Sequence, residues 1–277
     1  MKIHSDVITS RNNAFVKWAA SLSEKKSRSQ SEVFIAEGIK LTQEALSSGL
    51  PITHILVNEE NDENVLEKIS DYINLPEFKS TELIMLSHNV FEKISTEKAP
   101  QGVICIIKYL DFFHNIDIIN KEEFFLGSKE RAIVLESVRD PSNLGSVIRS
   151  AVAFGVEHII LSDDCADIYN PKTVRSAMGS LFKIKVTRIK NLLSFISAAK
   201  ASGRRVLSAE LNVRAIPLDS DCLFDTDLIV IGNEGHGVSP DVSRHCTNGI
   251  YIPISKNTES LNASVAAAIF MWEQRKK

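Results

Sequence analysis

The chain alternates short apolar runs with amphipathic stretches along most of its length. Apolar runs rich in β-branched residues are typical of buried strands, and apolar residues three and four positions apart are typical of helices. In the first part of the chain this pattern predicts strands at 33–36, 52–57 and 102–107, and helices at 12–27, 38–47 and 64–69. Together they predict a small alternating α/β unit that ends near Tyr109.

A second alternating series begins at Ala132. The expected strands are 133–135, 158–161, 184–186, 206–209, 227–231 and 250–254, and the expected helices are 142–154, 171–180, 192–201 and an apolar stretch after Asn262. Short apolar strands separated by amphipathic helices predict a parallel sheet covered on both faces, so the fold class is α/β. Ligands of such sheets bind beyond the carboxyl ends of the strands.

A length of 277 residues suits two domains. We expect an N-terminal domain over residues 1–110, a linker over 111–130 and a C-terminal domain over 131–277. The linker segment mixes charges with phenylalanines and has no Gly/Ser-rich composition, so we expect it to pack partly on a neighbour.

The composition argues for a cytoplasmic protein with a local, not a global, basic surface. The net charge of −3 excludes a strongly basic nucleic-acid binder as a class. No apolar run approaches the ~18 residues of a membrane span, and the first twenty or so residues contain no apolar core of a secretory signal. The four cysteines lack CxxC spacing, which favours reduced thiols over disulfides or zinc.

The loop expected after Leu135 carries the first candidate chemistry, in the run ESVRDPSNLGSVIRSAVAFG. Asp140 is a suitable N-cap, and Pro141 then occupies the first helical position. Asn143 and Arg149 are six residues apart, or ~240° around a helix, which aligns them only loosely. A helix N-terminus with a nearby arginine can bind phosphate, although a helix cap and a surface arginine explain the same pattern.

The loop expected after residue 231 reads GNEGHGVS and places Glu234 among glycines, of which Gly232 is the first. Closely spaced glycines let backbone amides face a ligand, but a tight turn explains them equally well. The spacing matches neither the dinucleotide-binding fingerprint nor the P-loop.

The third loop lies in IPISKNTESLNASVAAAIF, between the last strand and the last helix. Capping the helix requires only one of Ser260 and Asn262. The whole polar set, with Glu259, is explained if the joint faces a ligand and the backbone of Ile252 and Leu261 lines one wall of a cleft.

The segments DPSNLGSVIRSA, IGNEGHGVS and IPISKNTESLNASVAAAI, in this order, resemble the three motifs of the SpoU (TrmH) family of RNA 2′-O-ribose methyltransferases, within the SPOUT superfamily. PKTVRSAMGSLFKIKV is similar to the family segment between the first two motifs, and FIAEGIKLTQEAL resembles the substrate-binding domain of many ribosomal-RNA members. Ile254 and Lys256 replace a methionine and a glycine that are common in the third motif.

The resemblance implies a deep trefoil knot and a homodimer whose active site uses both chains. It implies S-adenosylmethionine as the cofactor, bound by backbone groups around Gly232, Ile252 and Leu261, and no metal. The catalytic residues that it implies are Asn143, Arg149, Glu234, Ser260 and Asn262.

Arg149 is unsuited to act as a base because a guanidinium is effectively always protonated. We expect it to bind the neighbouring phosphate and to stabilise the developing alkoxide, with Glu234 and Asn143 orienting Arg149 and the ribose. Alignment of hydroxyl, methyl and sulfur then provides most of the rate.

A basic segment near the N-terminus is the expected contact with RNA phosphates. The segment contains one acid, Glu24, and five cations: Arg11, Lys17, Lys25, Lys26 and Arg28. A solvated helix face is the plainer interpretation of this segment. The long N-terminal domain favours ribosomal over transfer RNA by analogy with the family. The alternatives are a transfer-RNA methyltransferase, a non-catalytic RNA-binding protein on the same fold, and a nucleotide-dependent oxidoreductase.

Overall fold

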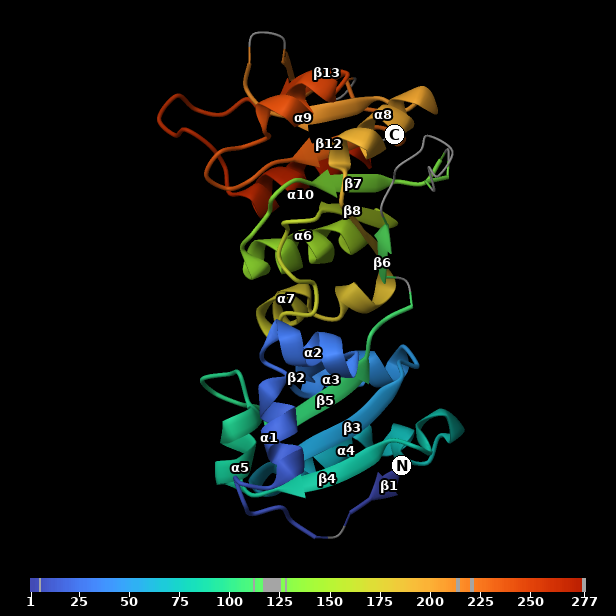
Figure 1. Cartoon of the computed structure of the whole chain (residues 1–277), viewed down its shortest axis with the longest axis vertical. Helices are drawn as coiled ribbons and strands as arrows, with labels where there is room; N and C mark the ends of the chain where they lie inside the picture. Colours follow the sequence, from blue (N-terminus) through green and yellow to red (C-terminus); the bar gives the residue numbers. More distant parts are fainter. Residues whose placement is uncertain are drawn as a thin grey trace. The chain divides into compact units, whose positions relative to one another are not determined.

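The computed structural model describes residues 1–4, 6–111, 113–116, 126–127, 129–212, 215–219 and 222–275. Two compact units are present (Figure 1): Met1–Leu110 with Asp167–Phe182, and Asp111–Ala166 with Lys183–Lys277. Residues 167–182, which we expected in the C-terminal domain, instead pack with the first unit.

The first unit contains a mixed sheet with the strand order β1-β4-β3-β5-β2. β1, β4 and β3 are parallel, and β5 is antiparallel to both β3 and β2. Its strands are β1 (Lys2–Ile3), β2 (Val33–Glu37), β3 (Ile52–Asn58), β4 (Glu82–Leu86) and β5 (Val103–Lys108), and its helices are α1 (Ala14–Ser21), α2 (Lys25–Ser31), α3 (Ile39–Ser47), α4 (Asp62–Ile73), α5 (His88–Ile94) and α7 (Pro171–Ala177). The sequence pattern did not predict β4 or α5, and it merged α1 and α2.

Arg28 explains both the break between α1 and α2 and the position of residues 167–182. Its side chain is only 1% exposed. Nη1 donates to the carbonyls of Leu22 and Ser23 at the end of α1, at 2.8 and 2.7 Å, and so satisfies groups that a helix end leaves unpaired. Nη2 donates to Asp167 Oδ2 at 2.6 Å. Arg28 therefore holds the unit together, and the expectation that it contacts RNA phosphates is wrong.

Tyr169 adds an aromatic contact beside this ion pair. Its ring stacks on Phe34, with centroids 4.7 Å apart, and on Tyr109, with centroids 4.1 Å apart. Its hydroxyl accepts a hydrogen bond from the Leu110 amide at 2.8 Å. These contacts tie the segment that begins at Asp167 to the end of the first unit's sheet.

The second unit contains a sheet with the order β11-β13-β10-β12-β7-β8-β9-β6, in which every described pairing is parallel. This confirms the predicted parallel sheet. Its strands are β6 (Phe113–Ile116), β7 (Ala132–Leu135), β8 (His158–Ser162), β9 (Lys185–Ile189), β10 (Val206–Ala209), β11 (Ile216–Pro217), β12 (Leu228–Ile231) and β13 (Asn248–Tyr251), and its helices are α6 (Pro141–Ala153), α8 (Leu192–Ala201), α9 (Pro240–His245) and α10 (Ala263–Gln274). The sequence pattern did not predict α9, β11 or β6, and β6 lies within the segment expected to be a linker.

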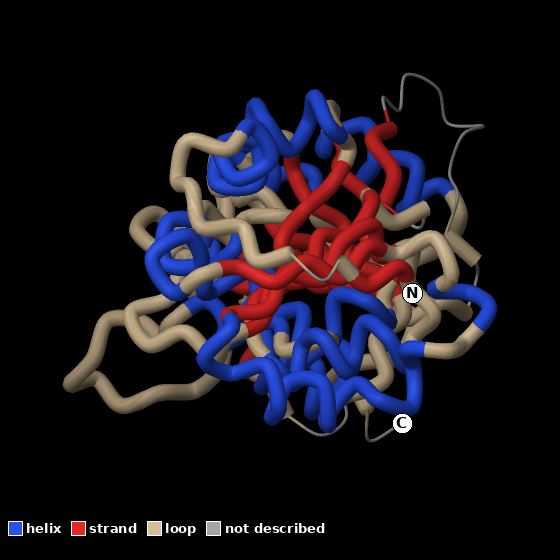
Figure 2. The backbone as a smooth tube through the Cα atoms, turned by 90° about the horizontal axis from the view of Figure 1, so that it is seen from below, coloured by secondary structure: helices blue, strands red, loops and turns tan. Residues whose placement is uncertain are grey.

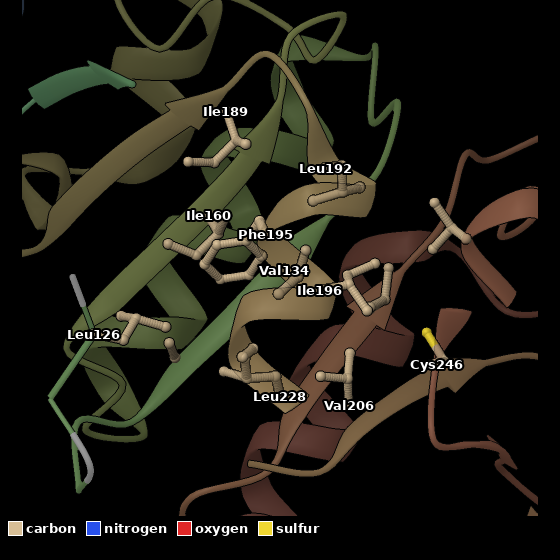
Figure 3. Close-up of a cluster of buried hydrophobic side chains, with 14 of the residues drawn as sticks. Leu126, Val134, Ile160, Ile189, Leu192, Phe195, Ile196, Val206, Leu228 and Cys246 are labelled. Atoms are coloured by element: carbon tan, nitrogen blue, oxygen red, sulfur yellow. The ribbon is translucent and has the colours of Figure 1, made fainter. Parts of the chain in front are cut away.

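Figure 2 shows helices on both sides of the strands. On one face, Phe195 and Ile196 of α8 pack on strand residues such as Val134 and Ile160 (Figure 3). Because side chains alternate along a strand, the residues between them face the other side. There α6 and α10 pack against each other, and α10 also contacts β12.

Three of the cysteines are buried and all four are free thiols. Burial raises the pKa of Cys105 and of Cys246 to about 12 in each case, so both stay protonated at neutral pH. No helix within the described ranges is long and apolar enough to cross a membrane.

Replacement of Arg28 by alanine is expected to destabilise the first unit by about 3 kcal/mol, because it leaves the carboxylate of Asp167 without its partner. Urea unfolding, followed by Trp18 fluorescence in a Trp272→Phe background, measures the change. Lys26→Ala on the same helix is the control, since Lys26 is exposed and its removal should cost less than about 0.5 kcal/mol. Equal effects of the two substitutions would contradict the structural role of Arg28.

Candidate active site

Three loops of the second unit meet at one edge of its sheet. β12, β10 and β13 are parallel neighbours, so their carboxyl ends lie side by side. The segments that follow them enclose a cavity of about 350 Å³, which α10 also lines. The lining residues of the strands and loops lie within 209–211, 231–237 and 250–261, and those of α10 are Ala263, Ala266 and Phe270. This is the position at which parallel sheets bind ligands.

The glycines of the loop that follows β12 form a tight turn, and this turn is also a wall of the cavity. The backbone groups of Asn233 and Gly237 exchange two hydrogen bonds of 2.9 Å. A Cβ on Gly232 would lie 2.1 Å from the carbonyl carbon of Gly237, so only glycine fits there. Gly237 has a φ of +69°, which also favours glycine. Gly232 itself lines the cavity.

Asn143 connects the polar residues of all three motifs. Its Nδ2 donates to Glu234 Oε1 at 2.9 Å, and its Oδ1 accepts from Asn262 Nδ2 at 3.0 Å. Glu234 lines the cavity directly. The structure therefore brings Asn143, Glu234 and Asn262, which are far apart in sequence, into one hydrogen-bonded row that reaches the cavity.

Helix caps hold this row in place. Asp140 caps α6 by accepting from the Asn143 amide at 2.8 Å, as predicted. The backbone N–H of Asp140 also donates to Glu234 Oε1 at 3.4 Å. Asn262 caps α10 by accepting from the Ser264 amide at 2.9 Å. Asn262 thus caps α10 and also belongs to the hydrogen-bonded row, so the two interpretations of the third motif are compatible.

Ser137, which was not predicted from the sequence, supports the loop between β7 and α6. It has a φ of +55°, a conformation that is uncommon outside glycine and asparagine, and no residue-type signal announces it. Its amide donates to Ser162 Oγ at 2.8 Å, and its carbonyl accepts from Asn233 Nδ2 at 2.8 Å. Its hydroxyl donates to Asp164 Oδ2 at 2.6 Å. These contacts stabilise the unusual backbone and join the first loop to the glycine turn.

Asp164 anchors the exposed guanidinium of Arg139 beside the site, at 2.8 Å. Burial alone would raise the pKa of this carboxyl. Hydrogen bonds from Arg139, Ser137 and Ser162 outweigh it and hold the pKa at about 2. The carboxylate is therefore ionised throughout the physiological range.

The third motif supplies much of the cavity wall. Ile252, Ser260 and Leu261 all line the cavity. Ile254 also lines it, whereas Lys256 is exposed and is not among the lining residues. The unusual lysine therefore leaves the cavity wall unchanged.

Arg149 stands apart from the other expected catalytic residues. It is exposed on α6 and does not line the cavity. In the described part of the chain its side chain makes no hydrogen bond or ion pair. A single chain thus joins Asn143, Glu234 and Asn262 by hydrogen bonds and places Ser260 in the same cavity as Glu234, whereas Arg149 lies outside both groups.

The cavity suits S-adenosylmethionine. Its volume lies in the range of small-molecule sites, and side chains such as Ile250 and Phe270 provide an apolar wall for a purine. Its described lining residues include three carboxylates, from Glu210, Glu234 and Glu259, and no lysine or arginine. This charge favours a sulfonium ligand over the phosphates of a dinucleotide.

Comparison with protein families identifies two matched regions. Residues 130–272 match the SpoU rRNA methylase family. The chain belongs to this family. Residues 13–105 match the MRM3-like substrate binding domain. The predicted RNA methyltransferase with a SPOUT-type α/β fold is thereby confirmed.

Similar proteins span nearly the whole length of this SpoU family member. The 23S rRNA (guanosine(2553)-2′-O)-methyltransferase RlmP of Bacillus subtilis is 32% identical over 97% of this chain and 98% of its own length. The 23S rRNA (uridine(2479)-2′-O)-methyltransferase of Streptomyces viridochromogenes is 29% identical, over 96% and 90%. The AdoMet-bound rRNA methyltransferase of Sinorhizobium meliloti has a TM-score of 0.78 and 28% identity, over 99% and 98%. These similarities support the expected S-adenosylmethionine cofactor and give no support to a nucleotide-dependent oxidoreductase.

Asn262→Asp is expected to separate the two roles of Asn262. The carboxylate can still cap α10, but it cannot donate to Asn143 Oδ1, so methyl transfer should fall at least about tenfold while the melting temperature is retained. Asn262→Ala should lower both, with about 1 kcal/mol lost from the cap. Initial rates with labelled S-adenosylmethionine and thermal unfolding measure the two effects. Full activity of Asn262→Asp would show that the row through Asn143 is dispensable.

Proposed function

We propose that this SpoU family member transfers the methyl group of S-adenosylmethionine to a ribose 2′-hydroxyl of ribosomal RNA in the cytoplasm. The observation that carries the proposal is the row of Asn143, Glu234 and Asn262, which reaches the cavity lined by Gly232 and Leu261. The named activities of the similar ribosomal-RNA enzymes and the match of residues 13–105 support the choice of substrate.

The residues of the row position the ribose. Bound S-adenosylmethionine supplies an electrophilic methyl group on a sulfonium, and a ribose hydroxyl is a weak nucleophile that must be held in line with it. Glu234 lines the cavity, and its Oε2, which accepts only a long hydrogen bond of 3.4 Å from Asn233 Nδ2, can also accept one from a ribose hydroxyl. Asn143 fixes Glu234 through Oε1. Ser260, a lining residue from the third motif, offers a second polar contact.

Arg149 enters this scheme through a second copy of the chain. An apolar groove lies between α6 and α10 and is lined by Ser150, Phe154, Ser264, Val265, Ala268, Ile269 and Trp272. Val265 and Trp272 are 46% and 42% exposed, which is unusual for large apolar side chains and marks an interaction face. Arg149 directly precedes this groove on α6. A homodimer through this face would cover the groove and carry Arg149 toward the partner's site, where it would stabilise the developing alkoxide.

The strand order supports a knotted C-terminal segment. β13 inserts between β10 and β11, and α10 then crosses to pack on β12 and α6. We propose that this segment passes through the loop formed by the preceding strands as a trefoil knot. An experimental structure with continuous density over 206–275 would test the threading.

Four exposed cations of the first unit are proposed to contact RNA phosphates: Arg11, Lys17, Lys25 and Lys26. They lie on and beside α1 and α2. Arg28, the fifth cation of the basic segment, is buried. Their role is to bring the target nucleotide to the catalytic unit.

Methyl transfer from labelled S-adenosylmethionine to RNA of a strain that lacks this protein tests the proposed function. We expect label in one ribosomal RNA, at a linkage that resists alkali because the 2′-oxygen is methylated. Label in transfer RNA would retain the enzyme and overturn the substrate. No label in any RNA, despite cofactor binding, would favour the non-catalytic RNA-binding protein.

A mixture of two inactive variants tests the shared site. Arg149→Ala and Glu234→Ala should each abolish most activity. Co-expressed, they form a heterodimer with one intact site, so about a quarter of wild-type activity should return under random pairing. Absence of recovery in a heterodimer isolated by two tags would contradict the supply of Arg149 by the partner.

Charge reversal at Lys17, Lys25 and Lys26 tests the RNA surface. It should weaken RNA binding and reduce the slope of affinity against salt by about one for each lost phosphate contact. The matched control is Lys68→Glu, on α4 of the same unit, which should leave both unchanged. Equal behaviour of the two variants would place the RNA elsewhere.

A further inference from the structure

Glu210 is a carboxylate of the cavity that neither the sequence motifs nor the row around Asn143 includes. Glu210 directly follows β10 and lines the cavity, in the loop between those that follow β12 and β13. Its backbone amide donates to the carbonyl of Ile250 at the end of β13, at 3.0 Å, which fixes its position on the sheet edge. The side chain is therefore held at a defined place in the wall.

Two serine hydroxyls orient this carboxylate. Ser208 Oγ, from β10, and Ser243 Oγ, from α9, each donate to Glu210 Oε1 at 2.5 Å. Ser208 is fully buried, so its hydroxyl is not replaced by solvent. Oε2 has no hydrogen-bond or ion-pair partner among the described residues, which leaves one oxygen free to accept hydrogen bonds from a ligand. Oriented charged acceptors form the stronger class of hydrogen bonds.

The topology of the cavity indicates which part of the cofactor meets Glu210. The apolar wall on α10, with Ala266 and Phe270, suits the adenine, and the reacting methyl must face Glu234. The ribose joins these two parts of the molecule. β10 lies between β12 and β13, so Glu210 occupies the middle loop, between the loop of Glu234 and the loop of Leu261. The two neighbouring hydroxyls of the ribose can donate hydrogen bonds to the free carboxylate oxygen of Glu210 there.

We propose that Glu210, oriented by Ser208 and Ser243, binds the ribose hydroxyls of the S-adenosylmethionine cofactor. This inference rests on the proposed function, since it assigns a contact within the same cofactor cavity. Glu210 is then a cofactor-binding residue, and the two serines are positioning residues.

Calorimetric titration with four adenosine-derived ligands tests the assignment. They are S-adenosylhomocysteine, 5′-methylthioadenosine, which lacks the amino-acid part, and the 2′-deoxy and 3′-deoxy forms of 5′-methylthioadenosine. Glu210→Gln preserves the shape and an acceptor for the serines. It should weaken the first two ligands about ten- to a hundredfold, as expected for a charge-assisted hydrogen bond. Removal of the ribose hydroxyl that it binds should weaken binding to the wild-type chain but cause no further loss in the variant. Ser243→Ala should give a smaller loss with the same dependence on the hydroxyls.

Glu259→Gln is the matched control, because it removes another carboxylate from the same cavity. Its effect should not depend on the ribose hydroxyls. Loss of S-adenosylhomocysteine binding with unchanged 5′-methylthioadenosine binding in Glu210→Gln would overturn the assignment in favour of the ligand's ammonium group. Unchanged binding of every ligand would overturn any contact with Glu210. If the wild-type chain bound no adenosyl ligand, the proposed function itself would fail, which is a distinct result.

Discussion

The side chain of Asn143 is the contact on which the arrangement of the site depends. Its amide group uses its donor end for Glu234 and its acceptor end for Asn262. An aspartate could not donate at one end, and a leucine of similar size could do neither. The row forms only because β12 neighbours both β7, which leads into α6, and β10, which neighbours β13. The adjacency of parallel strands thus converts three separate motifs into one site.

The surrounding structure stabilises this contact at several points. Asp140 fixes the start of α6, and the turn at Gly232 fixes the loop of Glu234. Ser137 adopts a backbone conformation that costs about 1–3 kcal/mol for residues of its kind, and its three hydrogen bonds offset that cost. The unusual backbone occurs beside the site and not in the core, as is common where a loop must present polar groups at a fixed position.

The sequence predicted most of the second unit because its signals are local. Asp140 and Pro141 mark a helix start by their own chemistry, and strands such as 133–135 are continuous apolar runs. Of the predicted site residues, Asn143, Glu234 and Asn262 are joined by hydrogen bonds, and Ser260 lines the same cavity as Glu234. Contacts between distant residues could not be read in this way. The burial of Arg28 depends on Asp167, which is 139 positions away, and a cluster of cations in sequence says nothing about such a partner. Similarly, Glu210 carries no motif, and only the neighbours of β10 place it at the cavity.

Amide hydrogen exchange with and without S-adenosylmethionine tests most directly whether the three loops form one cofactor site. We expect slower exchange on binding in 209–211, 232–237 and 252–261 together, because the ligand would bridge all three segments. The loops that follow β8 and β9, at the same edge of the sheet, should exchange unchanged. Protection there instead, or protection of only one of the three loops, would contradict the site described around Asn143.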